Sequence, residues 1–361
     1  MISRWLWRAG WLLLPAAWVL HRFVHNEALV FFVACASLVP LAKTMGDATE
    51  TLAERMGPAA GSLLNATFGN AAELILGISA LRHGHVDLVK GSVTGSILAN
   101  LLLVGGGSIV TGGIRFSRLR FNRLAASSNV ATLFLAVVAM VVPTLLSLGS
   151  NPRFDPALLS EEICAVLMVM YALSLWFSLR THREHVSSPR EEPAATSAVA
   201  AKRRAPAHQR RVAVELGRLL GAAAATALAS ELLVEALGGT VTALGLPETF
   251  VGVVIVAIVG NAAEHSTALL FANRGDMDVA LGIAWESSKQ IALLVAPLLV
   301  IAGVILGVPM DLAFSRFEVV ALGISVIALA LIALDGETHW LEGAFLLAVY
   351  AVLGLGFFFV G

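Results

Sequence analysis

The stretch FGNAAELILG, residues 68–77, lies inside an apolar run long enough to cross a lipid bilayer, yet it contains Asn70 and Glu73. A carboxylate at the centre of a bilayer costs on the order of 3 kcal/mol on insertion scales, so it is retained where it faces a cavity, a partner or an ion. The pentapeptide GNAAE occurs again at 260–264. The recurrence of a buried carboxylate predicts a functional site within a membrane domain.

The composition of the chain is that of a membrane protein. Hydrophobic residues make up 58% of the 361 residues and charged residues 14%, against roughly 45–50% and about 25% in soluble domains. The formal net charge of −1 argues against a nucleic-acid partner. Cys35 and Cys164 lie in apolar runs, so we interpret them as packing residues that form no disulfide framework. The lipid bilayer is the expected surrounding.

Apolar runs predict an all-α integral membrane protein with about eleven transmembrane helices. The first run follows two arginines, as a signal peptide would, but no small-x-small cleavage site follows it, so we interpret it as a helix. Most of the 24 Lys and Arg residues then lie on the side of the N-terminus, which predicts a cytoplasmic N-terminus and an external C-terminus in a plasma membrane. The predicted spans are 7–24, 27–43, 60–82, 91–111, 125–148, 157–179, 212–237, 249–272, 279–307, 317–334 and 338–360.

The chain contains an internal repeat. A displacement of 191 residues aligns the two GNAAE pentapeptides, and twelve of the thirty-six positions in 69–104 then match 260–295 without a gap. Each half has five predicted spans, an odd number, so the second half enters the membrane from the opposite side, as in many secondary transporters. We expect four parts, which are an extra N-terminal helix at 1–26, five-helix repeats at 27–180 and 212–361, and a cytoplasmic basic linker at 181–211.

Inverted symmetry brings Glu73 and Glu264 together near the midplane of the membrane. Two carboxylates in one dry site repel each other, and either protons or a divalent cation relieve that repulsion. The amide oxygens of Asn70 and Asn261 add ligands of the kind that Ca²⁺ prefers. The predicted ion-binding residues are Glu73, Glu264, Asn70, Asn261, Gly69, Gly260, Ser96, Ser287 and Gln290.

Several of these positions have a structural alternative. Each glutamate is able to form a permanent ion pair, with Lys90 or Lys289 as the partner. The two serines are small enough to serve close helix packing, and Asn100 and Gln290 are either neutral oxygen ligands or interhelical hydrogen-bond partners. The acidic segment GDATETLAERMG, residues 46–57, is predicted to be a solvated surface helix rather than a site of ion recruitment.

His265 directly follows Glu264, and imidazole titrates near neutral pH, so His265 is a candidate proton relay. Adjacent positions of a regular helix do not face each other, which leaves a purely structural histidine as the alternative.

Four segments resemble the two repeats of the Ca²⁺/H⁺ antiporter family, within the cation/Ca²⁺ exchanger superfamily. The resemblance implies that Glu73 and Glu264 coordinate Ca²⁺ and exchange it for protons, that these ions are cargo, and that no cofactor takes part. The extra N-terminal helix and the eleven spans also fit this family. The segments are LLNATFGNAAELI (63–75), VKGSVTGSILANLLLV (89–104), VGNAAEHST (259–267) and SSKQIALLVAP (287–297).

The chain departs from the family pattern beside the second motif. The family has Gly-Ser-Ser, an uncharged residue and Gln, whereas this chain has Glu286 before the two serines and Lys289 after them. The two charges are three positions apart on a helix and are able to neutralise each other. Alternatively, Glu286 adds a third carboxylate to the site, or Lys289 adds a fixed positive charge that changes the exchange stoichiometry or the ion preference. The basic linker also replaces an acidic helix of many relatives.

These features predict a secondary antiporter that exports Ca²⁺ from the cytoplasm in exchange for H⁺ by alternating access. Na⁺-coupled Ca²⁺ exchange and monovalent cation/H⁺ antiport are the alternatives, followed by a cation channel. An enzyme is not expected, because the chain has neither a GxSxG nor an HExxH motif.

Overall fold

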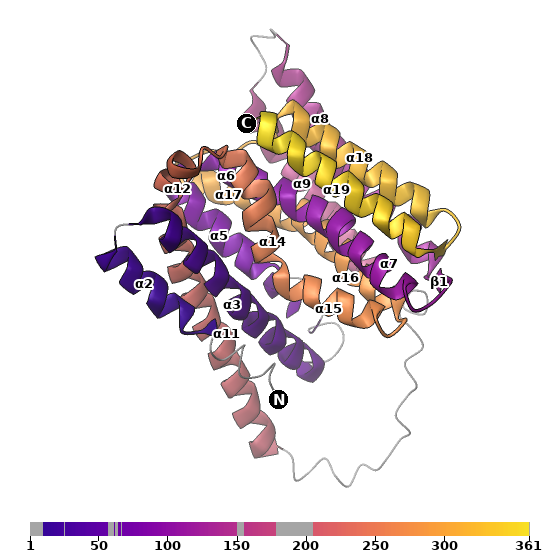
Figure 1. Ribbon diagram of the computed structural model, residues 1–361, viewed down its shortest axis with the longest axis horizontal. Coiled ribbons are helices and arrows are strands. Elements are labelled where there is room, and N and C mark those ends of the chain that lie inside the picture. The colour runs from indigo at the N-terminus through magenta and orange to yellow at the C-terminus, as the bar shows by residue number, and fades with distance from the viewer. Residues whose placement is uncertain are drawn as a thin grey trace.

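The computed structural model is an assembly of long, closely packed helices (Figure 1). Helices α2, α3 and α11 lie along one side, α8, α18 and α19 lie along the other, and α5, α14, α15 and α16 run between them. The structure describes residues 10–24, 26–56, 61, 64–65, 67–149, 155–177 and 205–360, without the side chains of 205–211.

The described part of the first half contributes four long transmembrane helices and two shorter ones. One of the long helices, Val86–Gly113, is continuous but changes from α to π geometry and back. The elements are α2 (Leu13–Phe23), α3 (Glu27–Met56), α5 (Ala71–Arg82), α6 (Val86–Leu98), the π-helix η1 (Ala99–Val104), α7 (Gly105–Gly113), β1 (Leu119–Arg120), α8 (Arg123–Ser147) and α9 (Pro156–Trp176).

The second half contains a corresponding long helix, Met277–Leu306, with its own π segment. The elements are α11 (Ala205–Glu235), α12 (Leu237–Leu244), α13 (Glu248–Phe250), η4 (Val251–Val256), α14 (Ala257–Gly260), α15 (Ala262–Ala272), α16 (Met277–Gln290), η5 (Ile291–Val295), α17 (Ala296–Leu306), α18 (Arg316–Ala333), β2 (Glu337–Thr338) and α19 (Trp340–Val360).

The membrane character predicted from composition is confirmed by the length and polarity of these helices. Within the described ranges, eight helices are long and apolar enough to span a bilayer, and Leu237–Leu244 with Glu248–Gly260 forms a further pair, bent by 110°. The predicted spans 7–24 and 60–82 correspond to α2 and α5, which have 11 and 12 residues and lie next to undescribed residues. The number of eleven spans therefore stays a prediction.

The structure corrects three details of the sequence analysis. Helix α3 continues through the acidic segment to Met56, beyond the predicted end of the span at residue 43. The apolar run gave only the part of the helix that crosses the membrane, and the helix extends past it. Helix α11 begins at Ala205, inside the predicted linker, whose remainder lies outside the described residues. A two-stranded antiparallel sheet, β1 with β2, pairs Leu119 with Thr338, so the fold is not strictly all-α.

Two helices are interrupted at the asparagines of the repeated pentapeptides. Asn70 has φ −106° and ψ 30°, and Asn261 has φ −92° and ψ 6°, outside the α-helical region. Helices α5 and α15 begin at the next residue, so Glu73 and Glu264 lie in their first turns. The two interruptions are 191 residues apart, the displacement that aligns the sequence.

Two of the described π segments, η1 and η5, follow the same displacement. Residues 291–295 of η5 correspond to 100–104, which lie within η1. Each π segment begins a few residues after a serine that was predicted to contact the ion, Ser96 or Ser287. Short π segments inside α-helices are frequent at functional sites, because they redirect backbone groups without ending the helix.

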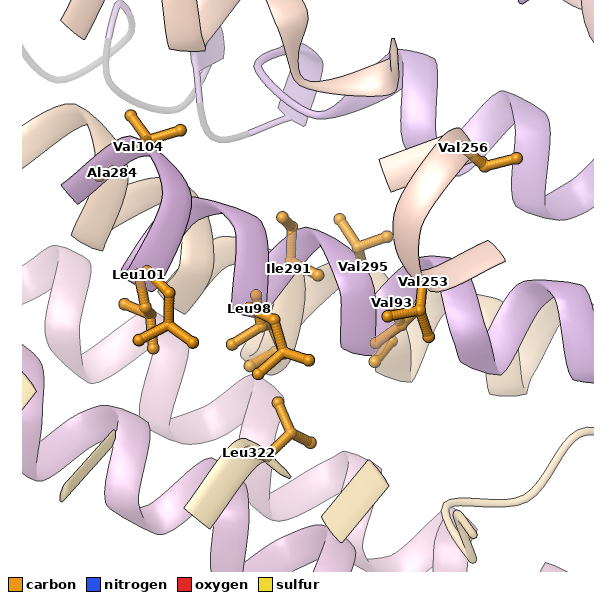
Figure 2. Packing of buried hydrophobic residues seen from close by; sticks show 14 of the residues in the cluster. Val93, Leu98, Leu101, Val104, Val253, Val256, Ala284, Ile291, Val295 and Leu322 are labelled. Carbon is orange, nitrogen blue, oxygen red and sulfur yellow. The ribbon is translucent and has the colours of Figure 1, made fainter. Parts of the chain in front are cut away.

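An apolar cluster holds these interrupted helices in place. Figure 2 shows Leu98 and Leu101 of the first half packed near Ile291 of the second half and Leu322 of α18. Close backbone approach adds to this packing at Gly95, where a Cβ would lie 2.1 Å from the Val253 carbonyl oxygen. The positions of the polar residues described below are therefore set by a tightly packed scaffold.

Candidate ion-binding site

The Glu73 side chain projects from the first turn of α5 toward the second half of the chain. A Cβ built on Gly260 would lie 3.5 Å from Glu73 Oε1 and 4.0 Å from Glu73 Cδ. The carboxylate of the first pentapeptide therefore lies against the backbone of the second pentapeptide. At these distances a Cβ at position 260 would be in ordinary van der Waals contact with the carboxylate.

The Glu264 side chain completes a pair of acidic groups. The carboxylates of Glu73 and Glu264 are near enough to repel each other electrostatically, and the Ser287 hydroxyl interacts with Glu264. Glu264 Oε2 is buried and has no hydrogen-bond partner among the described residues. Both glutamate side chains are half-buried. The arrangement leaves carboxylate oxygens available to protons or a cation.

Asn70 connects the first pentapeptide to α16. Its Nδ2 donates to Gln290 Oε1 at 2.7 Å, and its Oδ1 accepts from the Ser287 hydroxyl at 3.2 Å. A Cβ on Gly69 would lie 3.3 Å from Gln290 Oε1, so Gly69 and Gln290 also meet. Gly69 and Asn70 are thus in contact with residues of α16 that lie more than 200 positions later in the chain.

Asn261 makes the equivalent connection from the second pentapeptide to α6. Its Nδ2 donates to the Ser96 hydroxyl at 2.9 Å and to the Ala257 carbonyl at 3.0 Å. The asparagine of each half therefore contacts the serine of the other half. Asn70, Asn261, Ser96 and Ser287 are all buried, so these contacts form behind the more accessible glutamates.

Asn100 joins the two connections at the centre of the site. Its Nδ2 lies 3.0 Å from the Ser287 hydroxyl oxygen and 3.5 Å from Asn261 Oδ1, and the residue is 0% exposed. Its Oδ1 has no hydrogen-bond partner in the described part of the chain. The sequence left Asn100 as either an oxygen ligand or an interhelical contact. Asn100 follows Ser96 by four residues, which places both side chains on the same helix face. This spacing was the feature of the sequence that could have assigned Asn100 to the site.

The two candidate lysine partners are engaged elsewhere. Lys90 Nζ lies 2.5 Å from Asp311 Oδ1 and donates to the Ala313 carbonyl at 2.8 Å. Lys289 Nζ lies 2.5 Å from Glu286 Oε2. Within the described ranges, no basic side chain forms an ion pair with Glu73 or Glu264. The structural ion pair weighed for these glutamates is therefore not the arrangement found.

His265 is less clearly connected to the site. Its Nε2 is buried and lacks a hydrogen-bond partner among the described residues, and it follows Glu264 on α15, where neighbouring side chains diverge. Its backbone N–H donates to the Asn261 carbonyl at 3.0 Å, as that of Leu74 does to Asn70 at 3.1 Å. The acidic residues Asp47, Glu50 and Glu54 are exposed on α3 and join no contact of the site described above.

The donor set suits a hard cation that keeps part of its hydration. Two carboxylates, amide oxygens and hydroxyls are oxygen ligands of the kind that Ca²⁺ takes in sets of six to eight. Among the described residues no group of three or more His, Cys, Asp or Glu side chains is arranged to hold a metal. A cation here would therefore depend on two carboxylates, neutral protein oxygens and water.

The family described as sodium/calcium exchanger protein matches residues 26–180 and 214–359 of the chain. The chain belongs to this family. This exchanger-family chain is 42% identical over 353 residues to the Ca²⁺/H⁺ antiporter of Aphanothece halophytica, covering 96% of this chain and 95% of that protein. It is 40% identical over 333 residues to the Ca²⁺/H⁺ antiporter ChaA of Bacillus subtilis, covering 92% of each. The resemblance to the Ca²⁺/H⁺ antiporters is confirmed.

Solved structures agree with this assignment. The exchanger-family chain superposes on native YfkE with a TM-score of 0.81 at 36% identity, over 97% of this chain and 100% of that one. It also superposes on the H⁺/Ca²⁺ exchanger CAX with a TM-score of 0.73 at 16% identity, over 99% of this chain and 92% of that one. The second likeness concerns the fold alone. The chain is therefore a multi-pass membrane protein related to transporters.

Proposed function

We propose that this chain is a secondary antiporter that exports Ca²⁺ from the cytoplasm in exchange for H⁺. The observation that carries the proposal is the pair Glu73 and Glu264, two mutually repelling carboxylates without a basic partner in the described structure. Protons and a divalent cation relieve the same repulsion, so each excludes the other. That exclusion couples the two fluxes. Relatives that are named Ca²⁺/H⁺ antiporters support the choice of ions.

The proposed architecture is an inverted repeat around this site. We assign an extra helix to 1–26, five-helix repeats to 27–180 and 212–361, and a cytoplasmic linker to 181–211, with eleven spans in total. The crosswise contacts of Asn70 with Ser287 and of Asn261 with Ser96 support this division, because two-fold related halves exchange equivalent contacts. The excess of Lys and Arg on one side supports a cytoplasmic N-terminus and an external C-terminus.

The proposed transport cycle uses the interrupted helices. Cytoplasmic Ca²⁺ binds Glu73 and Glu264 with help from Asn70, Asn261, Asn100 and nearby hydroxyls, and protons leave. The halves then move so that the site faces outward, where protons displace Ca²⁺. Helix breaks at the asparagines and the π segments η1 and η5 support such movement, because their backbone is not locked into regular α-helix.

Transport into everted membrane vesicles with an acidic lumen tests this function. The full-length wild type is expected to accumulate Ca²⁺ against its gradient while the pH gradient lasts. Glu73→Gln and Glu264→Gln are each expected to reduce uptake by about a thousandfold, because a unit charge about 4 Å from a cation contributes about 4 kcal/mol. Glu162→Gln, a change of an exposed glutamate on α9, is the matched control.

The same vesicles distinguish the alternatives. Uptake that requires a Na⁺ gradient would assign Na⁺-coupled exchange, and Ca²⁺ movement that never exceeds equilibrium would assign a channel. Full pH-driven uptake by either glutamine variant would contradict the two-carboxylate site. The wild type in vesicles without a pH gradient provides the baseline for each comparison.

A further inference from the structure

An intrahelical ion pair lies next to the candidate site, on the last turn of α16 before the π segment η5. Lys289 Nζ lies 2.5 Å from Glu286 Oε2, and the Lys289 side chain is only 6% exposed whereas that of Glu286 is 44% exposed. A lysine this deeply buried is stable when a carboxylate compensates its charge. The pair brackets Ser287 and directly precedes Gln290, two residues that contact Asn70.

The first half of the chain has no such pair at the equivalent positions. With the displacement of 191 residues, Glu286 corresponds to Gly95 and Lys289 to Leu98. Gly95 is packed against the backbone of Val253 so closely that no side chain fits there, and Leu98 belongs to the apolar cluster. Repeat symmetry therefore does not account for the two charges.

The two charges lie at different angles around the axis of α16. Glu286 is four residues before Gln290 and so shares the helix face of that residue, whereas Lys289 points in another direction. Successive residues of a helix are rotated by about 100°, so Lys289 is directed about 200° away from Ser287 around the axis. The helix η5 that continues α16 packs against α9, and Tyr171 of α9 is within electrostatic range of Glu286. Neither charge forms an ion pair with Glu73 or Glu264 in the described structure, so we take the width of one helix, about 10 Å, as the separation between the pair and the two carboxylates.

We propose that Glu286 and Lys289 form a charge-compensating pair that sets how tightly the site holds a divalent cation. This inference rests on the proposed function. While both charges are present, they largely cancel at the site. At about 10 Å and an effective dielectric constant of about 20, Coulomb's law gives an upper limit of about two hundredfold for the effect of one unit charge on the affinity for a divalent cation. Screening by water and salt around the partly exposed Glu286 reduces the expected effect to about tenfold. Lys289 and Glu286 therefore act in opposite directions, with neither required to touch the ion.

The test measures the apparent KM for Ca²⁺ and the maximal rate of pH-driven uptake in three variants. Lys289→Met leaves Glu286 uncompensated, so KM is expected to fall about tenfold and the maximal rate to fall as Ca²⁺ release slows. Glu286→Gln leaves Lys289 uncompensated, so KM is expected to rise about tenfold. The double variant, with both changes, is expected to return to within about threefold of the wild-type KM, because no net charge remains.

A matched control comes from α11, where Arg218 and Glu215 form another i,i+3 ion pair at 2.7 Å. Arg218→Met removes one charge from that pair and is expected to leave KM unchanged. The reversed pair E286K/K289E keeps compensation, so its KM is expected to stay near that of the wild type. This reversal also keeps the inference testable if a single variant fails to fold, as judged by size-exclusion chromatography.

The outcomes separate this inference from the proposed function. Shifts of KM in the same direction in both single variants, or a double variant as impaired as the worse single variant, would show a merely structural pair. Wild-type KM in all variants would also overturn the inference and leave the antiporter intact. Absence of pH-driven uptake by the wild type would overturn the proposed function itself.

Discussion

The two halves of the chain agree at the pentapeptides and differ one helix later. GNAAE is identical in both, and each asparagine contacts the serine of the other half. In contrast, Asn100 on η1 corresponds to Ile291 on η5, and Gln290 on α16 corresponds to Ala99 on η1. The identical part places the two carboxylates, whereas the divergent part decides which neutral oxygens and which charges surround them. Equivalent backbone positions therefore do not imply equivalent roles.

The pH dependence of Ca²⁺ uptake tests the equivalence of the two carboxylates, and it is the largest of the effects expected from comparing the two halves. If one Ca²⁺ displaces a proton from each glutamate, the apparent KM rises by up to about a hundredfold per unit fall in cytoplasmic pH, at pH values where both are protonated without Ca²⁺. Uptake is therefore expected to weaken as cytoplasmic pH falls and to recover as it rises. Initial rates in everted vesicles at several bath pH values measure this slope.

A slope limited to about tenfold per pH unit in the wild type would mean that only one carboxylate exchanges a proton. The maximal rate at saturating Ca²⁺ serves as the internal control, since competition at one site leaves it unchanged. A wild-type KM that is independent of pH would contradict the shared site.

Exchanging the divergent residue between halves gives the next effect. Asn100→Ile installs the residue of the second half and removes the donor that reaches the Ser287 hydroxyl and Asn261. A buried polar group without its partner costs about 1–3 kcal/mol, so KM for Ca²⁺ is expected to rise about tenfold or more. Isothermal titration of Ca²⁺ into the purified protein in detergent checks the affinity directly.

The matched change in the second half is Ile291→Val, which shortens the equivalent side chain without altering polarity. This control is expected to leave Ca²⁺ affinity nearly unchanged, because it touches no hydrogen bond of the site. Wild-type affinity in Asn100→Ile would assign Asn100 to packing alone.

Replacing the glycine of each pentapeptide by alanine is expected to give the smallest effect, a difference in stability between two equivalent positions. At Gly69 an added Cβ would lie 2.6 Å from the Asn65 carbonyl oxygen, whereas at Gly260 its nearest neighbour, Glu73 Oε1, is 3.5 Å away. Gly69→Ala is therefore expected to destabilise the protein by about 1–3 kcal/mol through overpacking, and Gly260→Ala by less. Thermal unfolding in detergent measures both variants, and an equal or reversed order would contradict the asymmetry.

The sequence predicted that the glutamates, asparagines and serines of both repeats belong to one site, because these residues recur at one fixed displacement. The hydrogen bonds between each asparagine and the serine of the other half came from the structure alone. Membrane character and family followed from composition and from the same motifs, and both are confirmed. The partners of Lys90 were not predictable in this way, because Asp311 lies 221 positions later and no repeat relates the two residues. The pairing of Leu119 with Thr338 was missed for a similar reason, since strands of two residues carry no period.

The contact of Glu73 with Gly260 has a consequence for the origin of the molecule. The first half supplies Glu73 and depends on the second half for the backbone that this carboxylate faces, so one half alone would lack this contact. If the proposed inverted repeat arose from one gene, an ancestor of half the present length needed two copies, inserted in opposite directions, to form this contact. Fusion of such copies would leave each free to diverge, and Asn100 and Lys289 differ from their counterparts Ile291 and Leu98 in this way.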